Sequence, residues 1–521
     1  MPIFLGLDSS TQSLKAELID TEHGILAASA AVNFGRDLPE YRCPEGYLQH
    51  SDPLVRHSDP LLWAAALDLV LQRLQQSGAP LDRVAGIGGS GQQHGSVYLN
   101  DQWQKILSVL NPASALAPQI APALARKTAP IWMDRATARQ CAELNARFGT
   151  RLQQDTGSPA VERFTGPQIR KFAQDDPAGY RKTATIHLVS SFMASLLCGA
   201  DAPIDYGDGA GMNLLNLKTL DWDREIVEFT ASGLLHKLPR LALATAVAGK
   251  LHPYFAKYGL KAGTPVAVWS GDNPCSLIGT GAWQAGTAVI SLGTSDTFFA
   301  AMRQPVTDPQ GYGHVFGNPA GGFMCLICFT NGSLAREQVK NDCGVDWQYF
   351  NSGFVPEAPA GNRGNLMLPW FMAESVPLVL QPGAHYRGEQ SFIDGTAPVA
   401  VKVRAILEGQ ALAMRLHSGW IGEPFSRIRV TGGASQCTAF VQILADVFQT
   451  PVERLASTGA AGIGAAMLAA HAVGGVSFEQ LTAQFAAPVE TIRPQPQHAA
   501  VYDSMLEAYR RFEAETRSGQ G

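Results

Sequence analysis

The sequence lacks a long hydrophobic run. Its 521 residues contain no stretch of about 18 consecutive apolar residues, so no membrane-spanning helix and no membrane partner are expected. The closest stretch, residues 459–475, is short, rich in glycine and alanine, and contains His471. We expect it to form a helix packed closely inside a domain. The first residues carry no basic segment and Asp8 interrupts their only apolar run, so no signal peptide is predicted.

Charged residues are also few, and neither sign predominates. Charged residues make up 16% of the chain, the formal net charge is −5, and no block of lysine or arginine stands out. This balance does not indicate a nucleic-acid or membrane-surface partner. An anionic ligand would therefore have to be neutralised locally, by backbone N–H groups, a lysine or a metal ion.

Cysteines are few and scattered. Of the eight, Cys325 and Cys328 form a C-x-x-C, but they lie in "FMCLICF", which is typical of a strand. Positions three apart in a strand point to opposite faces, and no second pair exists to complete a zinc site. We interpret the cysteines as buried structural thiols, which places the protein in a reducing, cytoplasmic compartment.

The chain is too long for one compact core, so two domains are expected. Short apolar runs typical of buried strands alternate with runs whose apolar residues recur at helical spacing, which predicts an α/β architecture with mixed sheets. Strands are expected at 83–89, 264–271, 287–293 and 426–433, and helices at 60–78, 403–420 and 438–450.

The domain limits follow from changes along the chain. We place an N-terminal domain at 1–265, a C-terminal domain at 266–485, and a polar helical segment at 486–521. Residues 351–400 are rich in proline and glycine and are expected to form a long surface excursion.

One long-range repeat joins the two predicted domains. Residues 3–20, "IFLGLDSSTQSLKAELID", and residues 287–302, "TAVISLGTSDTFFAAM", share one plan: an apolar strand, a small or polar tip with an aspartate, and a second apolar strand. Two hairpins of one design predict a duplicated fold in which both tips face a common cleft.

The first hairpin suits a triphosphate and its metal. Ser9, Ser10, Thr11 and the N–H groups of the turn can donate hydrogen bonds to phosphate oxygens. Asp8 is repelled by phosphate but can hold Mg²⁺, and Lys15 supplies a positive charge on the return strand. The alternative is a plain hairpin with a solvated lysine. The second copy, at Gly293, Thr294 and Ser295, favours the phosphate interpretation.

A further glycine pair follows a later strand. In "VTGGASQC" (430–437), Gly432 and Gly433 would allow a flat base or a phosphate to approach the backbone closely. A tight turn between a strand and a helix explains the same residues.

Asp272 lies between a strand and a helix in "VWSGDNPCSL" (268–277). An aspartate before Pro274 is often only a helix cap. The functional interpretation is a base that accepts the proton of an attacking hydroxyl during phosphoryl transfer.

The stretch "GIGGSGQQHGSVYLNDQWQKIL" (86–107) matches the G-x-G-x-x-G of dinucleotide-binding proteins. That motif must open a helix, whereas this stretch continues into a predicted hairpin, and no acidic residue follows about 20 residues later. A dehydrogenase is therefore disfavoured. The loop instead presents Gln93 and His94, which can bond a polyol, although the sequence alone favours a structural loop histidine.

Taken together, these motifs resemble the FGGY carbohydrate kinases, from about residue 3 to residue 470. The stretches that carry the resemblance are "DSSTQSLK" (8–15), "GGSGQQHGSVY" (88–98), "PIWMD" (130–134), "ERFTGPQI" (162–169), "PIDYGDGAGMNLL" (203–215), "GDNP" (271–274), "SLGTSDT" (291–297), "NGSLAREQV" (331–339) and "TGGAS" (431–435). The resemblance implies a two-domain, actin-like ATPase fold, a duplicated ribonuclease H-like unit, with the active site in the interdomain cleft.

The resemblance also implies an activity: Mg²⁺-dependent transfer of phosphate from ATP to D-xylulose. By the same resemblance, Asp272 is the base, and His94, Arg163, Asp272 and Asn273 hold the sugar. Trp347, Gly432, Gly433 and Ala434 would lie near the nucleotide. Kinases of ribulose, gluconate or glycerol remain open, as do a non-kinase actin-like ATPase and a sugar-binding protein. A monomer and a homodimer are both compatible with the sequence.

Two positions depart from the family pattern. Ser10 stands where most members have glycine in the first phosphate motif, which raises a question about the geometry of that turn. Cys437 stands where relatives often have asparagine, and a thiol is a poor hydrogen-bond donor to a nucleotide.

Overall fold

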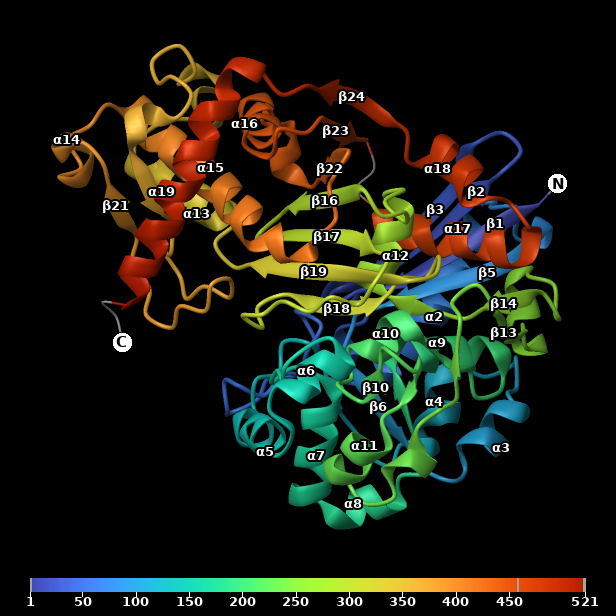
Figure 1. The fold of residues 1–521 in the computed structure, drawn as a ribbon. Coiled ribbons are helices and arrows are strands. Elements are labelled where there is room, and N and C mark those ends of the chain that lie inside the picture. The colour runs from blue at the N-terminus through green and yellow to red at the C-terminus, as the bar shows by residue number, and fades with distance from the viewer. Residues whose placement is uncertain (1, 457–458, 519–521) are drawn as a thin grey trace.

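A computed structural model describes residues 2–456 and 459–518. Figure 1 shows two sheets whose strands continue across the middle of the molecule, with helices α5 to α8 and α11 gathered at one end and α13, α15, α16 and α19 at another. Each large sheet has seven strands within the described residues. The two-domain α/β fold expected from the sequence is therefore confirmed.

The first sheet has the strand order β13-β14-β5-β1-β2-β3, and β15 also pairs with β5. β1 pairs antiparallel with β2, so that Asp8 lies opposite Lys15, and parallel with β5, so that Asp8 lies beside Ser90. Its strands are β1 Ile3–Ser9, β2 Ser13–Asp20, β3 Ile25–Asn33, β5 Val84–Gly91, β13 Val247–Lys250, β14 Pro265–Ala267 and β15 Ser270–Gly271.

The second sheet has the order β18-β19-β17-β16-β22-β23-β24. Its centre repeats the first sheet: β16 is antiparallel to β17 and parallel to β22, as β1 is to β2 and β5. The duplicated plan is thus present in the strand order. Its strands are β16 Thr287–Leu292, β17 Asp296–Met302, β18 His314–Gly317, β19 Phe323–Phe329, β22 Arg427–Thr431, β23 Val452–Leu455 and β24 Pro488–Ile492.

Two helices, α12 (Asp272–Gly279) and α17 (Ala460–Gly474), pack against each other between the sheets, and α17 also covers β1 and β5 (Figure 1). Glycine makes this contact possible: a Cβ on Gly464 would lie 1.9 Å from the carbonyl oxygen of Cys275, and one on Gly6 would lie 2.1 Å from that of Gly462. The prediction of a closely packed helix at 459–475 is confirmed.

The remaining helices cover the outer faces. The predicted helices appear as α2 (Pro60–Gln76), α15 (Val399–Ser418) and α16 (Thr438–Phe448); Asp59 caps α2 by accepting from the N–H of Leu61. The other α-helices are α1 Phe34–Asp37, α3 Trp103–Ser108, α4 Leu116–Ile120, α5 Ala138–Phe148, α6 Thr150–Thr156, α7 Thr165–Asp175, α8 Pro177–Lys182, α9 Val189–Cys198, α10 Tyr206–Ala210, α11 Arg224–Thr230, α13 Ser333–Asp342, α14 Gln390–Ile393, α18 Phe478–Phe485 and α19 Ala499–Ser518.

Within the part of the chain that the structure describes, short strands form five further pairs. They are β4 His57–Ser58 with β7 Ala129–Pro130, β6 Ser96–Leu99 with β8 Thr185–Leu188, β9 Ile204–Asp205 with β12 Leu241–Ala242, β10 Leu215–Asn216 with β11 Asp221–Trp222, and β20 Leu366–Leu368 with β21 His385–Arg387.

The sheets divide the chain later than the sequence predicted. A boundary at residues 265–266 falls inside the first sheet, because β14 and β15 pair with β5, and the second sheet begins only at Thr287. The segment 486–521 is also not separate: β24 pairs with β23, and α19 packs on α15 and α16. Strand pairing across long loops has no local signal in the sequence, which explains both differences.

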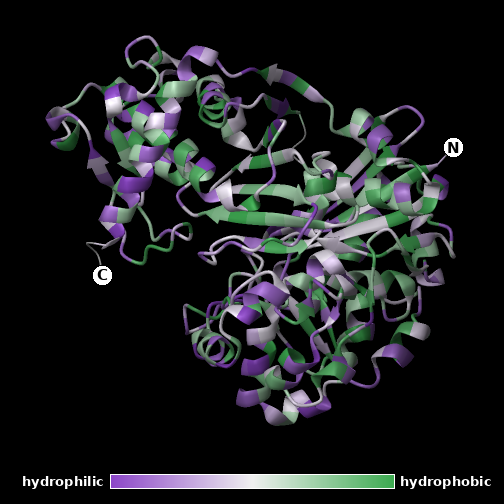
Figure 2. Ribbon diagram, viewed as in Figure 1, coloured by the Kyte–Doolittle hydropathy of each residue, from purple (hydrophilic) through white to green (hydrophobic). Residues whose placement is uncertain are grey.

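The expected surface excursion at 351–400 is likewise only partly at the surface. Phe354, Leu368 and Trp370 are buried against the second domain, because the segment carries enough apolar side chains to join its core. Figure 2 shows hydrophobic residues concentrated in the central strands and hydrophilic ones on the outer helices. Within the described range, no helix has the length and apolar character needed to cross a bilayer.

Candidate active site

The first hairpin presents a carboxylate without a tight cationic partner. Asp8, near the end of β1, is 8% exposed, and its Oδ1 accepts a hydrogen bond of 2.9 Å from Ser90 Oγ. Burial raises the pKa of Asp8, whereas the Ser90 bond and the charge of Lys15 lower it. Among the described residues, Lys15 forms no ion pair. The cation and the carboxylate are therefore both left for a ligand.

At the tip of this hairpin, residues 9–12, the two hydroxyl groups of Ser10 and Thr11 are used differently. Ser10 Oγ donates to the carbonyl oxygen of Ser13 at 3.0 Å, so its hydrogen is used inside the turn. Thr11 Oγ1 accepts from Trp132 Nε1 at 2.8 Å, which leaves the hydroxyl hydrogen of Thr11 able to donate outward. Ser10 is not among the described residues with positive φ, so serine fits this turn without backbone strain.

A second carboxylate, Glu17, lies beside Asp8 and was not predicted. It follows Lys15 by two positions on β2 and therefore shares its face of the sheet. Burial, and then the negative charge of Asp8, raise the pKa of Glu17 to about 7. A Cβ on Gly462 of α17 would lie 2.5 Å from Glu17 Oε2 and 3.7 Å from Asp8 Cβ, so both acids meet at the start of that helix.

This pair of carboxylates fits Mg²⁺, which prefers oxygen ligands and keeps several waters. Glu17 Oε2 is buried and has no hydrogen-bond partner among the described residues, so it is free to serve a cation or its water shell. Within the same residues, the only cluster of three potential ligands lies elsewhere, at Asp20, Glu22 and His23. A magnesium ion at Asp8 would therefore take most of its ligands from water and phosphate.

Asp272 begins α12 and faces the same site. Its Oδ1 accepts hydrogen bonds from the backbone N of Asn273 at 2.9 Å and from Asn273 Nδ2 at 3.2 Å. Burial, and then the charge of Asp8, raise the pKa of Asp272 to about 7. β15, which directly precedes Asp272, pairs with Ser90 and Gly91 of β5, and β1 pairs with the same two residues at Asp8 and Ser9, so the two carboxyl groups lie in one region. A carboxyl group with this pKa can accept a proton near neutral pH.

Gln93 and His94 follow β5 and reach the same region. Gln93 Oε1 accepts from Asn273 Nδ2 at 3.0 Å. His94 has a positive φ of 69°, and its ring stacks on Phe164 with centroids 4.3 Å apart. Its Nδ1 lies 2.8 Å from the carbonyl oxygen of Gly211, which can only accept, so Nδ1 carries the hydrogen.

The protonation state of His94 defines what it offers. Burial, and then the positive charge of Arg163, lower the pKa of His94 to about 3, so the ring is neutral. With its hydrogen on Nδ1, the Nε2 atom is an acceptor for a hydroxyl hydrogen.

Arg163 places a cation beside His94 and Phe164. Its Nη2 donates to His314 Nε2 at 3.1 Å, its guanidinium lies 5.7 Å from the ring of Phe164, and it forms no ion pair with another described residue. Burial lowers its pKa. A planar fork of donors without a carboxylate partner is suited to bonding two oxygens of a polyol. His314, on β18 of the second sheet, holds the arginine and was not predicted.

The predicted nucleotide residues surround a cavity of about 360 Å³ in the second domain. Of the seven nucleotide residues predicted in this domain, Ser295 and Gly432 do not line the cavity. The other five do: Gly293, Thr294, Trp347, Gly433 and Ala434. The sequence missed further lining residues, among them Ser333, Arg336, Asn351, Gln436 and Phe440. Ser333 and Arg336 lie in "NGSLAREQV", which carried the family resemblance but no assigned role.

Trp347 and Cys437 form parts of the wall. Trp347 is 45% exposed, its ring meets Phe350 edge-on with centroids 5.3 Å apart, and Lys340 Nζ lies over the ring, 5.3 Å from its centroid. Cys437 caps α16: its Sγ accepts from the N–H of Phe440 at 3.4 Å. Gly432 acts differently, because its φ is +89° and a Cβ there would lie 2.4 Å from the carbonyl oxygen of Leu292.

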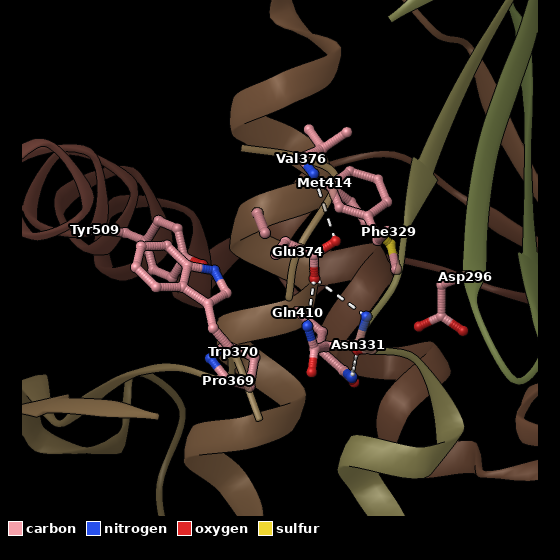
Figure 3. Close-up of a pocket in the computed structure, with 11 residues that line it drawn as sticks. Asp296, Phe329, Asn331, Pro369, Trp370, Glu374, Val376, Gln410, Met414 and Tyr509 are labelled. Carbon is pink, nitrogen blue, oxygen red and sulfur yellow. Dashed lines mark hydrogen bonds between the residues drawn. The ribbon is translucent and has the colours of Figure 1, made fainter. Parts of the chain in front are cut away.

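A buried polar network supports the second tip, residues 293–295. Asp296 directly after it is bound by Arg336 through two hydrogen bonds, of 2.7 and 3.0 Å, and Arg336 also donates to Gln410 Oε1 at 2.9 Å. Asp296 and Gln410 line a cavity of about 20 Å³, large enough for one water molecule. Figure 3 shows both residues, with Glu374 and Asn331 bonded to each other nearby. Arg336 thus connects the tip, the network and the cavity of about 360 Å³.

Comparison with known proteins agrees with these observations. Residues 3–279 match the model of the FGGY family of carbohydrate kinases, N-terminal domain, and residues 288–473 match that of its C-terminal domain. Xylulose kinase of Rattus norvegicus is 37% identical over 98% of this chain and 96% of its own length, and xylulose kinase 2 of Arabidopsis thaliana is 38% identical over 90% and 87%.

Solved structures show the same fold at lower identity. Xylulose kinase from Rhodospirillum rubrum superposes with a TM-score of 0.84 at 21% identity, covering 99% of each chain. Glycerol kinase from Plasmodium falciparum with ADP superposes with a TM-score of 0.81 at 18% identity, covering 98% of each chain. The two matched family domains and the relatives that span nearly its whole length show that this chain belongs to the FGGY family of carbohydrate kinases.

Proposed function

We propose that this kinase transfers the γ-phosphoryl group of ATP to the terminal hydroxyl of D-xylulose, giving D-xylulose 5-phosphate. The substrate is proposed from the relatives named xylulose kinase, which resemble this chain over nearly its whole length. The observation that carries the reaction type is the position of Asp272: it directly follows β15, which pairs with β5 at the same residues as the end of β1 that carries Asp8, and its pKa is raised to about 7.

In the proposed mechanism, Asp272 accepts the proton of the attacking hydroxyl. Asn273 holds Asp272 Oδ1 through two hydrogen bonds, which would orient the carboxyl group toward the hydroxyl. His94 Nε2 accepts from one sugar hydroxyl, and the fork of Arg163 donates to others. A site that bonds each hydroxyl rejects analogues lacking one by up to about 10⁴-fold, because the unpaired groups stay buried.

The phosphate groups of ATP would lie between the two tips. Asp8 and Glu17 would hold Mg²⁺, which when bound neutralises charge on the phosphate oxygens. Lys15 and the donors of Thr11 and the turn would bind the phosphates, and the nucleotide would occupy the cavity beside Trp347. Closure of the domains would exclude water, so that the sugar rather than solvent receives the phosphoryl group.

The cellular setting is proposed on chemical grounds. All eight cysteines are free, and unpaired thiols persist in reducing compartments, so we propose a cytoplasmic enzyme. No nucleic-acid partner is proposed, in keeping with the absence of a basic block.

The proposal is tested by a panel of polyols in an assay of ADP release: D-xylulose, D-ribulose, gluconate and glycerol. We expect kcat/KM for D-xylulose to exceed that for each of the others by at least about 10-fold. A preference for another polyol would replace the substrate and keep the kinase. ADP release indifferent to every sugar would overturn the proposed function and favour an ATPase.

A further inference from the structure

Beside Asp272 and Gln93 lies a second pair of buried carboxyl groups, Asp205 and Asp208, which the proposed mechanism does not use. Asp205, at the end of β9, is fully bonded: Oδ1 accepts from the N–H of Asp208 at 2.8 Å, and Oδ2 accepts from that of Gly207 and from Ser270 Oγ. It caps α10 and so has a structural role.

Asp208 differs from its neighbour. It is completely buried, and its Oδ2 accepts a short hydrogen bond of 2.5 Å from Ser190 Oγ. Its Oδ1 is buried with no hydrogen-bond partner among the described residues. A buried carboxyl oxygen without a donor costs free energy, so the site requires a further explanation.

Gln93 supplies the complementary group. Its Oε1 accepts from Asn273, but its Nε2, which can only donate, is buried and also lacks a partner among the described residues. Both unpartnered side chains crowd Gly271: a Cβ there would lie 2.5 Å from Gln93 Cγ and 3.1 Å from Asp208 Oδ1. The φ of Gly271 is −73°, open to any residue, so glycine is needed here for space and not for conformation.

We propose that Asp208 is a positioning residue for Asp272, acting through Gln93 and Asn273. Gln93 Nε2 donates to Asp208 Oδ1, directly or through one water molecule, and this fixes the carboxamide so that Oε1 faces Asn273. Asn273 in turn holds Asp272 Oδ1 through its backbone N and Nδ2. The inference rests on the proposed function, because it takes Asp272 as the base.

The surroundings of Asp208 favour its uncharged form. Burial raises its pKa well above the ordinary value, and the charges of Asp205 and Asp272 raise it further, whereas the Ser190 bond lowers it. The titratable groups that face Asp208 or lie on the elements packed against α10 are Asp205, Asp272, Cys275 and His314. His314 has a lowered pKa, so none of these groups is a cation at neutral pH. An uncharged Asp208 orients Gln93 without placing another negative charge beside the base.

The test compares Asp208→Asn with Asp208→Ala. Asparagine keeps an oxygen that accepts from Gln93, so kcat should stay within about 3-fold of the parent; alanine removes it, and kcat should fall about 10–100-fold, as for other outer partners of a functional group. The KM for the sugar should change less than kcat in both. In Asp208→Asn, the acidic limb of kcat/KM against pH should stay within about 0.3 pH units, because no charge is removed.

A matched control is Asp201→Asn, which removes a partly buried acid of the same domain that is bonded to Trp103 Nε1 and His187 and not to Asp208, Gln93 or Asn273. This control should change neither kcat nor the acidic limb of kcat/KM against pH, even if it lowers the stability of the fold. Equal effects of asparagine and alanine at 208, or an acidic limb lowered by about one unit in Asp208→Asn, would overturn the inference. If the parent enzyme shows no sugar-dependent turnover, the proposed function fails instead, so the two failures are distinguishable.

Discussion

The two hairpins share a topology but not a charge environment. In the first, Asp8 lies opposite Lys15 and beside Glu17, and no described cation forms an ion pair with it. In the second, Asp296 lies opposite Leu292, and Arg336 binds both of its carboxyl oxygens. One acid is thus left open toward the site, whereas the other is neutralised inside the domain.

This difference indicates how a duplicated fold divides its work. Strand order supplies two equivalent tips, but the local partners decide what each tip can bind. The first can hold a cation because its carboxylate is not neutralised, and the second can shape a nucleotide cavity because its carboxylate is used for support.

The largest effect is expected from removing the open acid. Asp8→Asn should lower kcat by about 10²–10³-fold, because a neutral amide is a weaker ligand for Mg²⁺ and its water shell. Single-turnover assays at increasing Mg²⁺ concentration would measure both the loss and a weakened dependence on the metal. Asp296→Asn is the matched control and should leave the Mg²⁺ dependence unchanged. Equal Mg²⁺ dependence in both variants would contradict the division of roles.

A large loss of stability is expected from exposing the neutralised acid. Arg336→Met leaves Asp296 buried without its cation, which costs about 3–5 kcal/mol when one partner of a buried pair is removed. Urea unfolding would show a lowered midpoint, and the double variant Asp296→Asn/Arg336→Met should recover part of it. A midpoint equal to that of the parent would show that the pair does not support the tip.

A pH effect follows from the coupling of Asp8 to Asp272. With a pKa of about 7, Asp272 is increasingly protonated below pH 7, so kcat/KM should fall about 10-fold for each unit below that value. The negative charge of Asp8 raises this pKa, so Asp8→Asn should move the limb to lower pH, whereas Asp296→Asn should not. A limb that does not respond to Asp8 would mean that the two acids are not close in the working enzyme.

The smallest effect is expected at the tip of the first hairpin. Ser10 does not adopt a positive φ, so Ser10→Gly restores the family residue without relieving strain. We expect kcat to change by less than about 2-fold and stability to fall by about 0.4–1 kcal/mol, because glycine gives the unfolded chain more freedom. Thermal unfolding and steady-state assays would measure both. A clear gain in stability would show that serine is strained in this turn.

The sequence predicted those parts of the candidate site that stand in short motifs. Asp8, the two hairpins and the Asp272–Asn273 pair stand in short motifs whose residue types suggest their chemistry, and the structure brings the two acids into one region. The closely packed helix at 459–475 was also predicted, because glycine and alanine at close spacing indicate tight packing.

Contacts between distant segments could not be predicted in this way. In the sequence, Glu17 is a single charge in an apolar strand with no apparent partner. In the structure it lies beside Asp8, and both acids contact α17, which is more than 400 positions away in the chain. Arg336 has a partner only because β17 and α13 meet, and the domain boundary was misplaced because β14 and β15 return to β5. These features depend on pairing and register, which leave no signal within a short window.

The most direct test of the account is sugar-dependent ADP release by Asp272→Asn, with nucleotide affinity measured on the same preparation. The substitution keeps the shape of the side chain and removes its ability to accept a proton. We expect turnover with D-xylulose to fall by at least about 10³-fold while the Kd for the nucleotide changes less than about 3-fold. Turnover close to that of the parent enzyme would contradict the assignment of Asp272 as the base.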